Sequence, residues 1–465
     1  MDTFVIEGGA RLSGRLQVDG SKNAALPLMA ASLLADDVLV LRNIPELSDV
    51  RSMKALLQQL GVDQEEQSDG SWKTQVRDPT LCHAKYDVVS TMRASICVLG
   101  PMVARRHYAR VSMPGGCAFG HRPIDLHLRG LEALGAKVRL ENGDIIAEAD
   151  RLRGATIFMG GPFGSTVTGT ANILSAAVLA EGTTVIESAA CEPEIVDLAN
   201  LLNSMGARIQ GAGSPRLVVE GVESLGGADH SVMPDRIVAG TWAVAAAATN
   251  GEVVLERFPW DSLLAMMDVL RQIGVRIERL DDGPDCAREA TVRVTSERHL
   301  RPAVITTQPH PGFPTDLQAQ FMALLCLAEG NSVITEKIYP ERFMHVAELS
   351  RMGGLFTRQG PTVVVQGVKS LIGAPVMASD LRASACLVIA ALAAKGQTTI
   401  NRVYHLDRGY VRMEERLSQL GANIQRVKAP PPNAVPEVRE STKSAPEIEI
   451  IGTSPAAADL VKTDR

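Results

Sequence analysis

The residues of this chain that could do chemistry stand where six nearly continuous apolar segments begin. The polar groups at those starts are GSKN (20–23), STMRAS (90–95), GSTVTGT (164–170), PDR (234–236), FPTD (313–316) and SDLRAS (379–384). A helix begins with unpaired backbone N–H groups and a partial positive charge, so several such ends directed at one cleft would bind anions. Four cations accompany them, namely Lys22, Arg93, Arg236 and Arg382. Any one of these could be a solvated surface charge, but together they favour a site for phosphate and carboxylate groups.

The segment MPGGCAFGHRPIDLH (113–127) carries Cys117, a cysteine that does not lie in an apolar run and has a cation, Arg122, nearby. Glycine and proline around Cys117 predict a mobile loop, and Arg122 would favour the reactive thiolate form. Cys117, His121 and His127 could instead be metal ligands. No second ligand pair accompanies them, so we expect no zinc site. By contrast, we predict that Cys97, Cys326 and Cys386 are buried as small apolar side chains, because each lies in an apolar run.

Asp316 follows Pro-Thr at the start of the fifth apolar segment. It could be a capping carboxylate in the first helical turn. Among cations facing a shared cleft, it could also remove a proton from a hydroxyl group. Two further cations, Arg342 in ERFMH and Arg408 in YHLDRGY, are predicted to lie on loops and to extend the positive surface.

A sixfold repeat is expected to position these groups. A tripeptide with a central glycine follows an amphipathic stretch at Gly positions 61, 135, 206, 274, 353 and 421, so the unit is about 70 residues long. The six apolar segments follow the same period, and a helix that is apolar all round must be buried on every side. We therefore predict a mixed α/β protein of six units, each with a central and an amphipathic helix and a small sheet.

The N-terminal segment resembles the strand halves of units three and five, whereas the last unit stops at 424–427 without its second strand. We predict that residues 3–8 supply that missing strand. The first domain would then be 22–233 and the second 1–21 plus 234–427, with three units each. The Pro-rich and charged range 428–465 is predicted to be a disordered tail.

Composition limits the possible partners of the chain. The net charge of −6, with interspersed signs, argues against nucleic-acid or membrane-surface binding and favours small-molecule partners. The seven cysteines have no CxxC spacing, which fits a reducing compartment. No signal peptide or apolar run of membrane-spanning length is evident, so we expect no membrane insertion and a cytoplasmic location. The sequence does not reveal the oligomeric state.

The motifs GSKNAALP, TMRAS, PGGC followed by RPIDLH, EPEIVDLAN, PDRI, PHPGFPTD-QAQF, ERFMHVAELSRMG, DLRAS and YH-DRGY occur in order over residues 1–427. In these the chain resembles the UDP-N-acetylglucosamine 1-carboxyvinyltransferases, a family of enolpyruvyl transferases. The resemblance implies two inverse α/β barrels of three pseudo-repeats each, with the active site in the cleft between them. It also implies transfer of the enolpyruvyl group of phosphoenolpyruvate to the 3-hydroxyl of UDP-N-acetylglucosamine, in peptidoglycan synthesis, without a metal or organic cofactor.

The same resemblance assigns roles to individual residues. Cys117 matches the proton donor that fosfomycin alkylates, and Asp316 matches the base for the sugar hydroxyl, with Lys22 and Arg408 also at the catalytic centre. The expected phosphoenolpyruvate-binding residues are Lys22, Asn23, Arg122, Arg382 and Arg408. The expected UDP-sugar-binding residues are Arg93, Arg122, Pro123, Ile124, Asp125, Leu126, Gly164, Ser165, Thr166, Val167, Asp316 and Ile338.

Two departures from the family pattern concern the sugar-nucleotide site. The diphosphate loop reads Gly164-Ser165-Thr166-Val167-Thr168 where many relatives have a lysine or a Ser-Val-Gly segment, and Val238 stands where a glutamate is common. Backbone amides and hydroxyl groups can still bind a diphosphate there, with one charge fewer. The alternatives are a 5-enolpyruvylshikimate-3-phosphate synthase, which carries Lys-Ser where this chain has Lys22-Asn23, and a weakly active paralogue that binds UDP-sugars.

Overall fold

The sixfold repeat is present as six four-stranded sheets of one topology. The structure is a computed structural model that describes residues 2–115, 124–284, 287–297 and 299–428. Within these residues, each sheet has one parallel pair followed by two antiparallel pairs. Three sheets, in strand order, are β16 (Ala228–Ser231), β3 (Leu39–Arg42), β5 (Trp72–Val76) and β4 (Val62–Glu66); β6 (His83–Ala84), β7 (Tyr108–Ser112), β9 (Asp144–Glu148) and β8 (Lys137–Glu141); and β10 (Thr156–Phe158), β13 (Thr183–Glu187), β15 (Arg216–Glu220) and β14 (Arg208–Gln210). The other three are β2 (Ser13–Gln17), β17 (Glu252–Phe258), β19 (Ala290–Thr295) and β18 (Arg276–Arg279); β20 (Val304–Thr306), β21 (Asn331–Thr335), β23 (Thr362–Gln366) and β22 (Leu355–Gln359); and β24 (Pro375–Met377), β25 (Gln397–Asn401), β1 (Asp2–Glu7) and β26 (Asn423–Lys428).

The parallel edge strand of each sheet comes from a different unit than the other strands. After its hairpin β4–β5, the first unit continues into β6, which pairs with β7 of the second unit. In the same way β16 leaves the third unit and pairs with β3 of the first. The three units of this half therefore close into a ring, and β2 closes the other half by pairing with β17.

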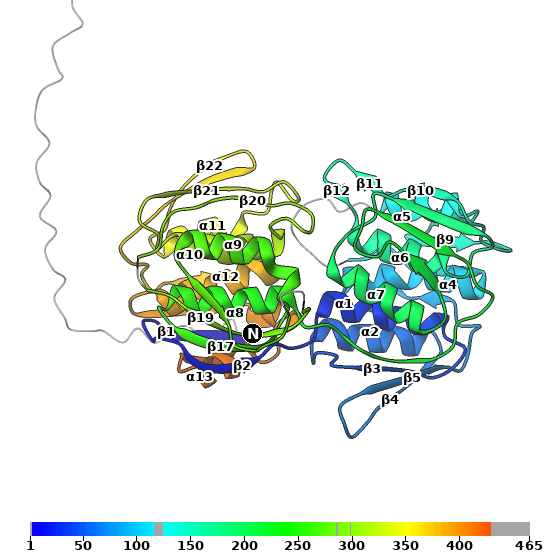
Figure 1. Cartoon of the computed structure of the whole chain (residues 1–465), viewed down its shortest axis with the longest axis horizontal. Coiled ribbons are helices and arrows are strands. Elements are labelled where there is room, and N and C mark those ends of the chain that lie inside the picture. Colours follow the sequence, from blue (N-terminus) through cyan, green and yellow to red (C-terminus); the bar gives the residue numbers. More distant parts are fainter. Residues whose placement is uncertain (1, 116–123, 285–286, 298, 429–465) are drawn as a thin grey trace, which may run out of the picture. The chain divides into compact units, whose positions relative to one another are not determined.

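The six apolar segments are central helices, as predicted. They form α1 (Lys22–Ala31) with η1 (Ser32–Leu34), η2 (Arg93–Val98) with α4 (Leu99–Arg106), α6 (Val167–Ala177), α8 (Arg236–Ala248), η4 (Thr315–Leu317) with α10 (Gln318–Leu325), and α12 (Leu381–Ala393). Within one half α8, α10 and α12 contact one another, and α1, α4 and α6 are linked by contacts in the other. Figure 1 shows α8, α10 and α12 between the sheet of β20, β21 and β22 and the sheet of β2, β17 and β19.

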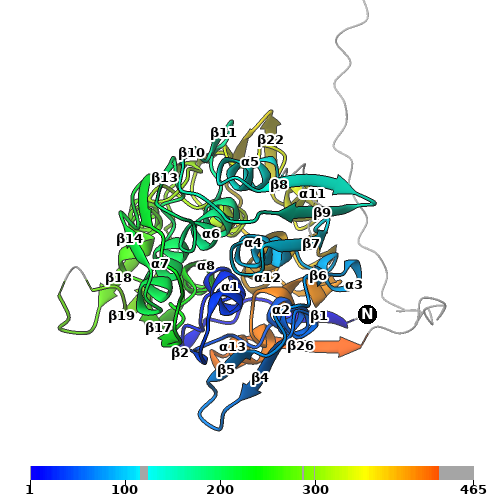
Figure 2. The same ribbon diagram turned by 90° about the vertical axis from the view of Figure 1, so that its right-hand side faces the viewer.

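The amphipathic stretches form outer helices that end at the repeated glycines. These helices are α2 (Ser48–Gln59), α5 (Asp125–Ala133), α7 (Pro193–Ser204), α9 (Leu264–Ile273), α11 (Met344–Arg351) and α13 (Met413–Gln419). All six glycines have positive φ, from 76° at Gly61 to 110° at Gly274, a conformation that glycine adopts without a steric penalty. Figure 2 shows α1, α4 and α6 in the interior with α2, α5 and α7 around them. The remaining short helices are α3 (Tyr86–Val89), η3 (Asp261–Leu263) and η5 (Val403–Arg408).

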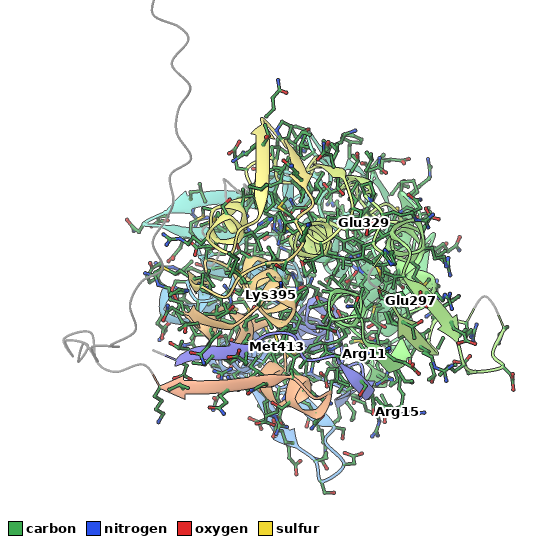
Figure 3. The ribbon with its side chains drawn as sticks, turned by 90° about the vertical axis from the view of Figure 1, so that its left-hand side faces the viewer. Arg11, Arg15, Glu297, Glu329, Lys395 and Met413 are labelled. Atoms are coloured by element: carbon green, nitrogen blue, oxygen red, sulfur yellow. The ribbon has the colours of Figure 1, made fainter. Side chains whose placement is uncertain are left out.

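The N-terminal strand completes the last unit, which confirms that prediction. Strand β1 pairs antiparallel with β25 on one side, with Phe4 opposite Ile400, and with β26 on the other, with Phe4 opposite Arg426. Figure 3 shows the blue β1 beside the orange β26, with Met413 of α13 nearby. Strand β26 ends at Lys428, one residue inside the range predicted as a tail, and the rest of that range lies outside the described residues.

Buried apolar side chains form two separate cores. One extends from Ala24 to Val232, and the other combines Phe4–Val18 with Ile237–Ile424. The two connecting segments run side by side, because Ser21 N donates to Met233 O at 2.7 Å and Asp235 N donates to Asp19 O at 2.9 Å. The division into two domains at 22–233 and 1–21 plus 234–427 stays a prediction about independent folding.

Candidate active site

Two of the predicted cations meet at one carboxylate. Lys22 is the first residue of α1, and Arg408 is the last residue of η5. Between them lies Asp49, in the first turn of α2 and only 5% exposed. Lys22 Nζ donates to Asp49 Oδ2 at 3.2 Å, and Arg408 Nε donates to Asp49 Oδ1 at 3.0 Å. Asp49 thus brings together a cation from each core.

Asp316 is the centre of a second cluster. Arg342 Nη1 donates to Asp316 Oδ1 at 2.8 Å, and Arg382 Nη2 donates to Oδ2 at 2.8 Å. Arg342 and Arg382 are 6% and 4% exposed, whereas 26% of the Asp316 side chain is exposed, so the guanidinium groups are buried and the carboxylate is partly open to solvent. The helix turn that contains Asp316 has no side-chain cap. Asp316 does lie in the first helical turn, as the alternative interpretation expects, and its carboxylate is bound there by the two arginines.

The electrostatics of this cluster keep Asp316 ionised. Burial alone would raise the pKa of Asp316, but the guanidinium groups of Arg382 and Arg342 hold that pKa well below its ordinary value. In this arrangement the carboxylate is a weak base, because releasing a proton from it is strongly favoured. The basicity of Asp316 would increase if either arginine moved to another partner.

Arg236 is also paired within the protein. Its Nε donates to Glu194 Oε1 of α7 at 2.9 Å, and both side chains are buried. Burial lowers the pKa of Arg236, yet the carboxylates of Glu194 and Asp316 raise it above the ordinary value. The cation at the start of α8 is therefore paired with a carboxylate of the protein itself.

Asp235 links the two carboxylate-centred clusters. It caps α8, where its Oδ1 accepts from Ile237 N at 2.8 Å, and its Oδ2 accepts from Lys22 N at 3.2 Å. Burial raises the pKa of Asp235, while the nearby guanidinium of Arg382 acts in the opposite direction. The structure thus brings Lys22, Arg382, Arg408 and Asp316, four of the predicted site residues, into one electrostatic network. Asn23, beside Lys22, is partly buried in the first turn of α1.

A histidine connects α5 with the start of α6. Asn172 Nδ2 lies 3.0 Å from His127 Nδ1, and Thr168 Oγ1 lies 3.3 Å from His127 Nε2. Since an amide N–H donates, Nδ1 accepts and Nε2 carries the proton that it donates to Thr168. Burial, with Arg93 acting in the same direction, lowers the pKa of His127 to about 3, so the ring is neutral. Thr168 is left with its own O–H to donate to a ligand.

The predicted diphosphate loop is a hairpin that leads into α6. Strands β11 (Gly160–Gly161) and β12 (Gly164–Ser165) pair antiparallel, and Thr166 caps α6 by accepting from Gly169 N at 3.2 Å. Gly164 has a φ of 105°, and a Cβ added there would lie 3.0 Å from Pro309 Cγ of the other core. Val167 is the first residue of α6, so the loop presents a helix N-terminus.

The remaining predicted UDP-sugar residues lie on two further segments. Ile124 is buried just before α5, exposed Asp125 is its first residue and Leu126 is partly buried. Ile338 follows β21, and its N–H donates to Glu336 Oε1 at 2.8 Å. The predicted residues Cys117, Arg122 and Pro123 lie outside the described residues.

The three cysteines predicted to be buried are buried. Burial raises the pKa of Cys97 and of Cys326 to about 12, and that of Cys386 well above its ordinary value, so these thiols are inert. In the part of the chain that the structure describes, no group of three or more His, Cys, Asp or Glu residues could hold a metal ion. Likewise, no described helix has both the length and the hydrophobicity that crossing a membrane requires.

Sequence reasoning missed the carboxylates that pair with the cations. Asp49 and Glu194 each lie in the first turn of an outer helix, where an acidic residue is common for local electrostatic reasons alone. Glu336 was missed as well, although it accepts from Thr307, Thr315 and Ile338 and so organises three loops. The only signal for Glu194 was its place in the EPEIVDLAN motif, which gave it no role.

Comparisons with known proteins identify the family of the chain. Residues 6–417 match the family described as EPSP synthase (3-phosphoshikimate 1-carboxyvinyltransferase). The chain is 50% identical over 431 residues to the UDP-N-acetylglucosamine 1-carboxyvinyltransferase of Myxococcus xanthus, which covers 92% of this chain and all of the relative. It is 51% identical over 433 residues to the protein of that name from an Anaeromyxobacter species, again covering 92% of this chain and all of the relative.

Solved structures show the same fold. The enolpyruvyl transferase NikO from Streptomyces tendae superimposes with a TM-score of 0.82 at 26% identity, covering 92% of this chain and 99% of NikO. An EPSP synthase from Acinetobacter baumannii superimposes with a TM-score of 0.72 at 19% identity, covering 92% of this chain and all of that one. The two-domain inverse α/β fold expected from the sequence is therefore confirmed. The chain belongs to the enolpyruvyl transferase family, which includes the UDP-N-acetylglucosamine 1-carboxyvinyltransferases and EPSP synthase.

Proposed function

We propose that this protein transfers the enolpyruvyl group of phosphoenolpyruvate to the 3-hydroxyl of UDP-N-acetylglucosamine and releases inorganic phosphate. The observation that carries the proposal is the identity of about 50%, over 92% of the chain, to proteins named for that reaction. The convergence of Lys22, Asp316, Arg382 and Arg408 supports it, because the reaction needs cations and a base at one place.

Phosphoenolpyruvate would bind by replacing protein carboxylates. Lys22 and Arg408 share Asp49, and Arg382 is held by Asp316. A substrate phosphate or carboxylate of the same charge can take over these partners, with Asn23 and Arg122 as further contacts. Arginine suits this exchange, because its planar fork binds a carboxylate or phosphate through two hydrogen bonds.

The same exchange would turn Asp316 into a base. When the substrate occupies Arg382, Asp316 keeps only Arg342 of its two cationic partners, and its pKa rises toward the ordinary value. The 3-hydroxyl oxygen then attacks the central carbon of phosphoenolpyruvate, and its proton passes to Asp316. The methylene carbon takes a proton, for which we assign the thiol of Cys117, and a tetrahedral intermediate forms.

The second half of the reaction is an elimination. The bond between the central carbon and the phosphate oxygen breaks, the methyl group returns a proton to the thiolate of Cys117, and the double bond is restored. The proton held by Asp316 leaves with the phosphate, so both groups return to their starting states. Fixed cations stabilise the charge that develops on the leaving phosphate, and no metal ion or organic cofactor is needed for these steps. This is a group transfer without any change of oxidation state.

The sugar nucleotide would lie along α5 and α6. Arg93, with Arg122 and Pro123, and the α5 start at Ile124, Asp125 and Leu126 are proposed to contact it. The hairpin residues Gly164, Ser165, Thr166 and Val167 would bind the diphosphate through backbone amides and hydroxyl groups, and Ile338 would contact the sugar. Two helix N-termini supply partial positive charge where the usual lysine is absent. We place the reaction in the cytoplasmic synthesis of peptidoglycan precursors.

Phosphate release with two acceptors tests the proposal. Purified protein is given phosphoenolpyruvate with either UDP-N-acetylglucosamine or shikimate 3-phosphate. We expect phosphate only with the sugar nucleotide. Release only with shikimate 3-phosphate would assign the protein to the EPSP synthase reaction. Binding of UDP-N-acetylglucosamine without phosphate release would instead indicate a binding paralogue.

A further inference from the structure

A buried hydroxyl group contacts the edge of Arg382 that faces away from Asp316. Arg382 uses Nε and Nη2 for Asp316 Oδ2, at 3.1 and 2.8 Å, while its Nη1 points to the hydroxyl of Tyr410 at 3.4 Å. Tyr410 is 1% exposed and follows η5, two residues after Arg408. Its ring packs edge-on against Trp242, with centroids 6.2 Å apart.

The hydrogen bonds around Tyr410 fix the direction of its O–H. Thr241 Oγ1 donates to Ile237 O at 2.7 Å, so its hydrogen is already used. The Tyr410 hydroxyl, 2.9 Å from Thr241 Oγ1, must therefore donate to it. Burial raises the pKa of Tyr410 against the opposing effect of Arg382, so the phenol stays protonated. The Tyr410 oxygen is then left to accept hydrogen bonds, from Arg382 Nη1 at 3.4 Å and from Gln320 Nε2 at 3.5 Å.

Gln320 connects the same network to the backbone that carries Asp316. Its Nε2 donates to Asp316 O at 2.9 Å and to Thr241 Oγ1 at 3.2 Å, and the residue is fully buried. Central helices α8 and α10 therefore anchor a hydroxyl group that contacts the start of α12. All these groups are rigidly packed, because each lies in a core helix or is buried against one.

We infer that Tyr410, whose hydroxyl group is oriented by Thr241, is a positioning residue. It holds the guanidinium of Arg382 in place for phosphoenolpyruvate while Arg382 exchanges its acidic partner, the carboxylate of Asp316, for the substrate. The inference rests on the proposed function. When Asp316 gives up Arg382 to the substrate, the Nη1 contact on the other edge can persist. Without that contact, Arg382 would have to be oriented by the substrate itself, which costs conformational entropy on binding.

Kinetics of hydroxyl deletions test the role of Tyr410. Tyr410→Phe keeps the ring against Trp242 and removes only the oxygen. At 3.4 Å the contact is long, so its loss should have the effect of one ordinary hydrogen bond and raise the KM for phosphoenolpyruvate about 3- to 10-fold. We expect kcat and the KM for UDP-N-acetylglucosamine to change less than about 2-fold. Tyr86→Phe, at a residue that is 69% exposed, is the matched control and should have wild-type kinetics.

A second pair of variants separates orientation from general stability. Thr241→Val removes the acceptor of the Tyr410 O–H and should raise the KM for phosphoenolpyruvate in the same way, whereas Thr241→Ser should restore it. Tyr410→Phe added to Arg382→Lys should cause little further rise, because both act on one contact. A lower Tm in Tyr410→Phe and Thr241→Val without a change in KM would overturn the inference. Wild-type protein that releases no phosphate would overturn the proposed function itself.

Discussion

Asp49 offers a sharp test of how the cations are held before substrate binds. The change Asp49→Asn keeps the size of the side chain and removes its charge. Lys22 and Arg408, whose side chains are 11% and 21% exposed, would then face each other without a carboxylate between them. We expect a destabilised protein whose stability recovers when an anion binds.

The size of the expected loss of stability follows from the burial of the Asp49, Lys22 and Arg408 side chains. Removing one partner of a fully buried ion pair costs about 3–5 kcal/mol, and removing one partner of an exposed pair costs about 0–1 kcal/mol. The Asp49 pairs lie between these limits, so we expect a loss of about 2 kcal/mol. For a core of this size such a loss lowers Tm by about 4–8 °C.

Thermal unfolding with and without phosphoenolpyruvate measures both parts of this expectation. In the wild type the substrate competes with Asp49, whereas in Asp49→Asn it fills a vacant partner position. The rise in Tm caused by saturating phosphoenolpyruvate should therefore be larger in the variant. Asp63→Asn is the matched control, because Asp63 pairs with Arg77 at 70% and 62% side-chain exposure and should contribute little. Equal Tm values for the two variants, or an equal response to phosphoenolpyruvate, would refute the reasoning.

Two further predictions concern Asp316 and Cys117. Because the folded pKa of Asp316 lies below its ordinary value of 3.8, its ionised form stabilises the protein above that pH, and this contribution is lost as pH falls toward the folded pKa. The gap in unfolding free energy between wild type and Asp316→Asn, measured by denaturant titration, should shrink as pH falls from 7 to 3; a constant gap would contradict the assigned ion pairs. Fosfomycin should inactivate the wild type by adding to Cys117, whereas Cys117→Asp should keep phosphate release and resist the drug. Equal inhibition of both proteins would show that another group is the target.

The repeat and its central helices could be predicted because each depends on local pattern. A glycine at a helix end needs only a left-handed φ, and Gly61, Gly206 and Gly421 all have one. A helix that is apolar on nearly all sides, such as α12, is stable only when it is buried on every side. The pairing of β1 with β26 could also be predicted. The sequence shows that the last unit lacks a strand and that the N-terminus carries an additional one.

The strands that pass between units could not be predicted. Strand β6 has two residues and β24 has three, which is too short for an alternating pattern. The carboxylate partners were missed for a different reason. Asp49 is separated by 359 positions from Arg408, and only the packing of the two cores brings them within 3.0 Å. The sequence showed the cations and their need for an anion, but not that the protein supplies one.

The pairing of three buried arginines, Arg236, Arg342 and Arg382, with internal carboxylates has a consequence for the proposed catalysis. An unpaired guanidinium at the burial of Arg382 would be costly, so the substrate-free protein needs Asp316 as a partner. Substrate binding then exchanges one carboxylate for another and leaves the charge around Arg382 nearly unchanged. The cost of breaking the internal pair limits affinity, which favours release of phosphate after the reaction. In the proposed mechanism Asp316 becomes more basic when Arg382 takes a new partner, which would couple proton removal from the sugar hydroxyl to the presence of phosphoenolpyruvate.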